Sequence, residues 1–294
     1  MQRRTFIQTL GSAAVLGPAF AQAAPAGGLP IKLSLKIGMV GFGKSLEEKF
    51  RTLKEMGYDG LELNSPGGVN KAEALAVATK VGLPLHGVVD SIHWRTKLSS
   101  PSAEERAKGL EALLGAIRDA KLIGGSAVLL VPGVVGGDTT HQQAWDRSII
   151  EIRKALPLAA KLGIHILIEN VWNGMFYDKD GDNNQTADQL AAYLDEINSP
   201  WVGSYFDIGN HQRFGKPADW IRTLGNRIVK LDVKDWGKEN GFCKIGEGDI
   251  DWPDVRKALM EIGYTGWATA EVGGGDEKRC AEVLQNMRTH LLGI

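Results

Sequence analysis

Residues 165–170 read HILIEN, an apolar run that ends in a carboxylate, and the same pattern recurs in three later runs: GSYFDIGN (203–210), IVKLDVKD (228–235) and GWATAEV (266–272). Each run is typical of a buried strand. The acidic residues near their carboxyl ends are Glu169, Asp207, Asp232 and Glu271. Because the carboxyl ends of parallel barrel strands converge on one face, we expect these four side chains to meet.

Strand-like and helix-like segments alternate along residues 24–294. The predicted strands are Lys32–Val40, Gly60–Asn64, Pro84–Asp90, Ala127–Pro132, His165–Val171, Val202–Asn210, Ile228–Asp235 and Gly266–Val272. The predicted helices are Leu46–Met56, Lys71–Val81, Ala103–Ile123, Gln143–Leu162, Ala187–Ile197, Ala218–Leu224, Pro253–Ile262 and Glu277–Leu292. This alternation predicts a parallel sheet with right-handed crossovers. We therefore expect an α/β fold of a single domain, a (β/α)8 TIM barrel with its active site at the carboxyl ends of the strands.

Four carboxylates in consecutive strands are unfavourable to bury unless a cation compensates for their lost hydration. We therefore interpret Glu169, Asp207, Asp232 and Glu271 as ligands of one divalent cation. Because all the donors are oxygens, a hard ion such as Mn²⁺ or Mg²⁺ is favoured over Zn²⁺.

Several short motifs resemble those of the xylose isomerase-like sugar phosphate isomerase/epimerase superfamily of TIM barrels: GLELN (60–64), LIEN (167–170), FDIGN (206–210), LDVKD (231–235), IGEGDIDW (245–252) and AEV (270–272). The resemblance covers nearly all of residues 24–294. It implies that the cation is held at positions 169, 207, 232 and 271, and that Glu169 and Glu271 are also the catalytic acid and base. Relatives usually have histidine where this chain has Asp232. Many also have histidine three positions after the aspartate of FDIGN, where this chain has Asn210 followed by His211.

The resemblance implies a metal-dependent isomerase or epimerase of a small carbohydrate, such as a free sugar, a keto-sugar or a related polyol. A carboxylate removes a proton next to a carbonyl, and a divalent cation stabilises the resulting enediolate. Carboxylates on both faces of the carbon then allow the proton to return on either side.

Further polar and aromatic residues follow other predicted strands, and the expected substrate-binding set is Glu62, His93, Trp94, Asn173, Asn210, His211 and Lys234. Lys234 either positions a substrate oxygen or forms an ion pair across the barrel. Trp94 either stacks on a sugar or caps the barrel. Glu247, in a glycine-flanked loop, either supports a metal ligand from outside or braces its own loop.

Residues 1–23 resemble a twin-arginine export signal, with Arg3-Arg4 near the start and the small-residue cleavage site Ala21-Gln22-Ala23. The barrel domain is therefore expected at 24–294, in the periplasm or another exported location, with no membrane span in the mature chain. Export also favours a substrate that is not phosphorylated.

The formal net charge is −1, with charges of both signs interspersed, so nucleic acid is not an expected partner. The expected partner is a small carbohydrate, and the sequence is compatible with a homo-oligomer. Cys243 and Cys280, the two cysteines, are expected to be unpaired.

Two alternatives remain open. A lyase that cleaves a 3-keto-glycoside by β-elimination needs the same cation and the same base. A non-catalytic periplasmic sugar-binding barrel needs neither, and the departures at Asp232 and Asn210 are the observations in its favour.

Overall fold

Parallel strands close into a barrel in the order β1-β10-β7-β6-β5-β4-β3-β2, so the first and last barrel strands are neighbours. The computed structural model describes residues 29–294, and the predicted export signal at residues 1–23 lies outside them. The barrel strands are β1 (Lys32–Lys36), β2 (Gly60–Ser65), β3 (Leu85–Asp90), β4 (Ala127–Leu130), β5 (His165–Glu169), β6 (Val202–Asp207), β7 (Ile228–Val233) and β10 (Trp267–Ala270). The predicted single-domain TIM barrel is confirmed.

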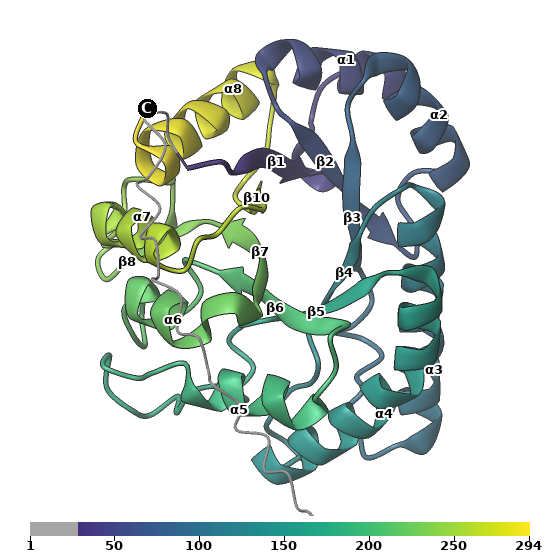
Figure 1. Cartoon of the computed structure of the whole chain (residues 1–294), viewed down its shortest axis with the longest axis vertical. Coiled ribbons are helices and arrows are strands. Elements are labelled where there is room, and N and C mark those ends of the chain that lie inside the picture. Colours follow the sequence, from purple (N-terminus) through teal and green to yellow (C-terminus); the bar gives the residue numbers. More distant parts are fainter. Residues whose placement is uncertain (1–28) are drawn as a thin grey trace, which may run out of the picture.

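Helices surround the barrel, as Figure 1 shows. They are α1 (Leu46–Met56), α2 (Lys71–Val81), α3 (Ala103–Leu122), α4 (His141–Leu162), α5 (Asp188–Ile197), α6 (Pro217–Leu224), α7 (Trp252–Glu261) and α8 (Glu277–Asn286). Several begin at a side chain that accepts a backbone N–H, and α4 has a full capping box between Thr140 and Gln143. Within residues 29–294, no helix is both long enough and apolar enough to cross a bilayer.

Several predicted strand and helix ends differ from the structure by a few residues. The first strand ends at Lys36 because Ile37–Met39 forms a 3₁₀ turn. The sixth ends at Asp207, whose carboxylate bonds the backbone of the next residues and turns the chain. The predicted loop after β7 contains an antiparallel hairpin, β8 (Asp235–Gly237) and β9 (Gly241–Cys243).

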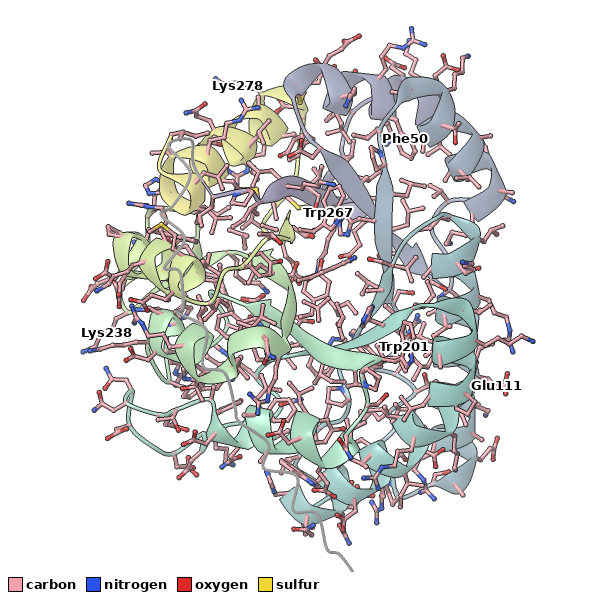
Figure 2. All side chains as sticks on the ribbon, in the orientation of Figure 1. Phe50, Glu111, Trp201, Lys238, Trp267 and Lys278 are labelled. Atoms are coloured by element: carbon pink, nitrogen blue, oxygen red, sulfur yellow. The ribbon has the colours of Figure 1, made fainter. Side chains whose placement is uncertain are left out.

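Apolar side chains fill the layer between the strands and the helices. Phe50 packs inward from α1, whereas Glu111, Lys238 and Lys278 lie at the outer surface (Figure 2). Cys243 and Cys280 are both free thiols, as predicted.

The inside of the barrel, by contrast, is largely polar. Lys230 Nζ donates to the carbonyl of His86 at 2.6 Å and lies 2.9 Å from its Nδ1. His86 Nε2 is 2.9 Å from the Ser34 hydroxyl, which donates to Thr269. Thr269 in turn lies 2.7 Å from the hydroxyl of Tyr205. His86 is thus a satisfied core histidine, and burial together with the Lys230 charge lowers its pKa well below its ordinary value.

Backbone hydrogen bonds join Met39–Gly41, which follows β1, to Gly275, which follows β10. We call this pair of segments the backbone clasp. Gly41 N donates to Gly275 O at 2.8 Å, and Gly275 N donates to Met39 O at 3.0 Å. Gly274 lies so close to this clasp that a Cβ placed on it would be 2.1 Å from Met39 O. A Cβ on the adjacent Gly273 would meet nothing within 4 Å.

We expect Gly274→Ala to lower the free energy of unfolding by about 1–3 kcal/mol, because the new methyl group forces the clasp apart. Gly273→Ala is the matched control and is expected to change stability by less than about 0.5 kcal/mol. Urea or thermal unfolding measures both. Equal stability of the two variants would contradict the tight approach described here.

Candidate metal centre

Four carboxylates meet at the carboxyl end of the barrel. Glu169 ends β5, Asp207 ends β6, Asp232 lies in β7, and Glu271 immediately follows β10. Each offers one oxygen, and these four oxygens all lie within 4.8 Å of one another. We call this group the carboxylate ring. The sequence prediction that these side chains converge agrees with the structure.

The turn after β6 fixes two members of the ring. Asp207 Oδ1 accepts the backbone N–H groups of Gly209 and Asn210 at 2.9 and 2.8 Å. The Asn170 side chain bonds both backbone groups of Asp207, at 2.7 and 2.9 Å. The Asn210 amide donates to Glu169 Oε1 at 3.3 Å. The LIEN and FDIGN motifs thus bond to each other and hold their carboxylates in place.

Two lysines contact the ring. Lys36 Nζ, from β1, lies 2.8 Å from Asp232 Oδ2 and 2.5 Å from Glu271 Oε1. Lys234 Nζ lies 2.9 Å from Asp207 Oδ2 and also bonds Glu271 Oε2. Of the two predicted roles of Lys234, the ion pair across the barrel is therefore present. Glu271 is the carboxylate that both ammonium groups share.

The two lysines make the pKa values of the ring carboxylates differ from one another. Burial and the nearby charge of Glu271 raise the pKa of Glu169 to about 8. Burial also raises the pKa of Glu271, but Lys36 and Lys234 outweigh that effect and bring it to about 2. Burial raises the pKa of Asp232 well above its ordinary value, against the opposing charge of Lys36. Two glutamates of one site thus favour opposite protonation states.

The ring has the properties that a divalent cation requires. Asp232 Oδ1 is buried and accepts no hydrogen bond, and an unpaired buried carboxylate oxygen is unfavourable. Asp207 Oδ2 makes only its ion pair with Lys234, without hydrogen-bonding geometry. If every group were ionised, five carboxylates would face three ammonium groups in and around the ring and leave two negative charges: Glu62, Glu169, Asp207, Asp232 and Glu271 against Lys36, Lys230 and Lys234. One divalent cation would neutralise this excess, and the all-oxygen donor set suits Mg²⁺ or Mn²⁺.

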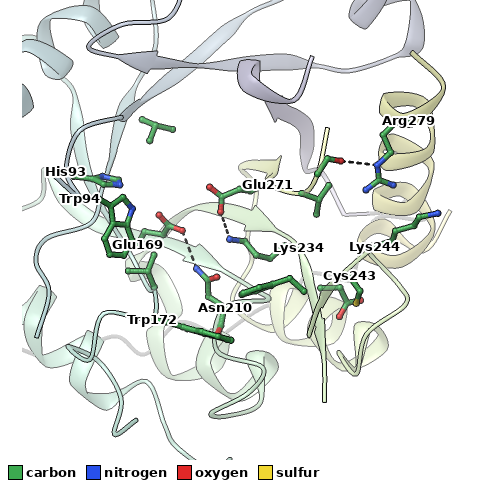
Figure 3. A pocket seen from close by; sticks show the side chains of 16 residues that line it. His93, Trp94, Glu169, Trp172, Asn210, Lys234, Cys243, Lys244, Glu271 and Arg279 are labelled. Carbon is green, nitrogen blue, oxygen red and sulfur yellow. Dashed lines mark hydrogen bonds and ion pairs between the residues drawn. The ribbon is translucent and has the colours of Figure 1, made fainter. Parts of the chain in front are cut away.

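A pocket of about 810 Å³ opens above the ring (Figure 3). Glu169, Glu271 and Lys234 line it, whereas Asp207 and Asp232 lie deeper. Its other lining residues include His93, Trp94, Trp172, Asn210, Phe242, Lys244 and Arg279. A pocket of this size is in the range that holds a small organic ligand with room to spare.

Aromatic side chains form the rim of the pocket. Trp94, Trp172 and Phe242 are 46%, 37% and 52% exposed; the first two lie in the loops after β3 and β5, and Phe242 lies in β9. The rings of Trp172 and Phe242 lie 5.1 Å apart, and the Arg213 guanidinium lies 5.3 Å from the Trp172 ring. Exposed aromatic faces beside polar groups suit the apolar face of a sugar ring.

Four of the predicted substrate-binding residues line the pocket: His93, Trp94, Asn210 and Lys234. His93 Nδ1 accepts the backbone N–H of Val131 at 3.1 Å. Burial lowers the pKa of His93 to about 3, which keeps the ring neutral. Trp94 projects into the pocket mouth rather than into the barrel (Figure 3).

Asn173 and His211 do not line the pocket. The Asn173 side chain bonds Gly133 O at 2.8 Å and the backbone of its own loop. His211 lies 2.9 Å from the Asn170 amide and stacks on Trp220 at 4.6 Å between ring centroids. Both side chains are engaged in holding loops, so the structure places them outside direct reach of a ligand in the pocket.

Glu62 and Glu247 also lie elsewhere than predicted. Glu62 is buried beneath the ring, where it accepts a hydrogen bond from Tyr205 at 3.1 Å. Glu247 is exposed on a turn and lies 4.0 Å from Lys244, away from the ring. Asp235 braces that loop instead, since it accepts the backbone N–H of residue 246 at 2.8 Å. The expected support of a ring ligand by Glu247 is therefore wrong.

Sequence reasoning missed Lys36, Asn170 and Phe242. Lys36 is two residues after Ser34 in β1, so both side chains point into the barrel. A lysine that points inward at the end of a strand could have identified it. Asn170 directly follows Glu169 in LIEN. Phe242 had no signal, because the β8–β9 hairpin that carries it was expected to be an irregular loop.

Comparisons with known proteins agree with this fold. One sequence relative is L-ribulose-5-phosphate 3-epimerase UlaE of Salmonella paratyphi A, 26% identical over 76% of this chain and 81% of that protein. Another relative, an uncharacterized protein of Methanocaldococcus jannaschii, is 26% identical over 81% of this chain and 84% of that protein.

Solved structures are similar in fold at lower identity. D-allulose 3-epimerase from Methylomonas sp. superposes with a TM-score of 0.71 at 18% identity, over 89% of this chain and 98% of that one. A 3-keto-D-glucoside 4-epimerase from E. coli superposes with a TM-score of 0.72 at 18% sequence identity, over 87% of this chain and 97% of that one. Residues 50–290 match the sequence profile of xylose isomerase-like TIM barrels. The chain belongs to the xylose isomerase-like TIM barrel family.

Proposed function

We propose that the protein is an isomerase or epimerase of a small carbohydrate that depends on one divalent cation, Mn²⁺ or Mg²⁺. The observation that carries this proposal is the carboxylate ring at the floor of a pocket with an aromatic rim. The sugar 3-epimerases among the relatives support it. Glu169, Asp207, Asp232 and Glu271 would hold the cation.

The two glutamates that line the pocket supply acid and base. One of them, as a carboxylate, takes a proton from the carbon next to a carbonyl. The electron pair of the broken C–H bond moves to the carbonyl oxygen. The other, as a carboxylic acid, delivers a proton to the opposite face of the same carbon. A bound divalent cation would supply positive charge where negative charge develops.

The proposed export of the protein favours a substrate without a phosphate group. A free sugar, keto-sugar or oxidised glycoside fits an exported location better than a sugar phosphate. Lys244 and Arg279 line the pocket and share the one carboxylate of Glu282, at 2.7 and 2.8 Å.

A lyase acting on a 3-keto-glycoside is the second candidate. The pocket volume and the exposed rim of Trp94, Trp172 and Phe242 favour a substrate with a second ring. NMR distinguishes the two reactions, because elimination releases two products whereas epimerisation releases one isomer.

Glu169→Gln is expected to lower turnover by about 10²–10⁴-fold, because the amide cannot transfer the proton. The assay is exchange of a substrate C–H for deuterium in D₂O, followed by NMR over a panel of keto-sugars and glycosides. Glu247→Gln is the control on the same face and should retain near-wild-type exchange. Near-wild-type exchange in Glu169→Gln would remove this residue from the acid–base role.

Removal of bound metal is expected to abolish exchange, and added Mn²⁺ or Mg²⁺ should restore it. Elemental analysis before and after chelation measures the metal content alongside the NMR assay. Exchange that persists in verified metal-free protein would rule out the cation-dependent mechanism.

Phe242→Ala is expected to raise KM for a glycoside about 3- to 10-fold with little change in kcat, since it removes one stacking surface of the pocket rim and no carboxylate of the ring. Met260→Ala, an equally exposed apolar residue on α7, is the control. A fall in kcat at constant KM would show that Phe242 acts on the chemistry instead.

A further inference from the structure

Lys36 contacts the carboxylate ring but does not line the pocket. Its ammonium group touches Asp232 and Glu271, yet Lys36 is not among the residues that line the cavity. Its side chain is only 12% exposed. A substrate in the pocket therefore meets Glu271 and Lys234, whereas Lys36 acts on the ring itself.

Lys36 uses one oxygen of Asp232 and leaves the other free. Oδ2 accepts the ammonium at 2.8 Å, and Oδ1 is buried without any hydrogen-bond partner. The ion pair thus occupies Oδ2, and Oδ1 is left without a protein partner. No other lysine of residues 29–294 contacts Asp232.

Lys36 sets the charge that the ring presents to a divalent cation. With all four ring carboxylates ionised, as ligands of a cation would be, Lys36 and Lys234 leave a net charge of −2. Beneath the ring, Glu62 and Lys230 cancel each other. Without Lys36 the net charge would be −3, more than one divalent cation neutralises.

We propose that Lys36 is a positioning residue that compensates the charge of Asp232 and thereby sets the affinity of the ring for its divalent cation. Lys36 and Asp232 then act as one unit: the fourth carboxylate adds an oxygen ligand, and the lysine removes the extra negative charge that this ligand brings. This inference rests on the proposed cation site.

Mn²⁺ titration of the metal-free, full-length protein tests the proposal by calorimetry, without any substrate. Lys36→Met should tighten Mn²⁺ binding at least about tenfold, because a positive charge next to the cation is lost. Asp232→Asn should weaken it at least about tenfold. The double variant, which keeps the net charge of −2, should return to within about threefold of wild type.

Lys244→Met is the matched control: it removes a lysine from the same face of the barrel, but one bound to Glu282 rather than to the ring. Its Mn²⁺ affinity should stay within about twofold of wild type. If Lys36→Met does not fold, the comparison of Asp232→Asn with the double variant measures the same charge effect in a background without the buried unpaired carboxylate.

The outcomes separate the two proposals. Unchanged or weaker Mn²⁺ binding on removal of Lys36, in either background, would overturn the role of Lys36 while leaving the cation site intact. Failure of the wild-type protein to bind Mn²⁺ or Mg²⁺ would overturn the proposed function, and the role of Lys36 with it.

Discussion

Mutual repulsion among buried carboxylates is the constraint on which this structure depends. Four of them offer oxygens within 4.8 Å of one another, and such an arrangement is stable only with compensating positive charge. Lys36 from β1 and Lys234, which follows β7, supply part of that charge. The proposed divalent cation would supply the remainder, and a small ion suited to oxygen donors matches this set of carboxylates.

The polar interior of the barrel supports this centre from below. A hydrogen-bonded chain runs from Lys230 through His86, Ser34, Thr269 and Tyr205 to Glu62. Most barrels fill this space with branched apolar side chains. Here the polar chain holds the charged side chains under the ring in fixed positions, and the apolar packing is concentrated between strands and helices. The layer between strands and helices therefore supplies most of the apolar packing, whereas the inside of the barrel carries the polar groups that support the ring.

The sequence allowed the fold and the ring to be predicted, because both follow from periodic patterns. Each apolar run that ends near Glu169, Asp207, Asp232 or Glu271 indicates a buried strand. The acidic residue also marks the carboxyl end of that strand and a side chain that points into the barrel. Lys36 was missed because its importance lies in contacts 196 and 235 residues away, which no local pattern encodes. Asn173 and His211 were misplaced because they follow strand ends in the sequence but turn away to bond their own loops. Strand ends were also overextended where side chain–backbone bonds, such as those of Asp207, stop the strand.

The clasp between Met39–Gly41 and Gly275 joins the beginning of the barrel to its end. The centre shares this property, since Lys36 and Glu271 come from the first and last barrel strands. Contacts so distant along the chain form slowly. During synthesis, Glu271 leaves the ribosome 235 residues after Lys36. A nascent chain thus carries an incomplete ring until both ends of the barrel have been made, and capture of the proposed cation by the complete ring would come after that point.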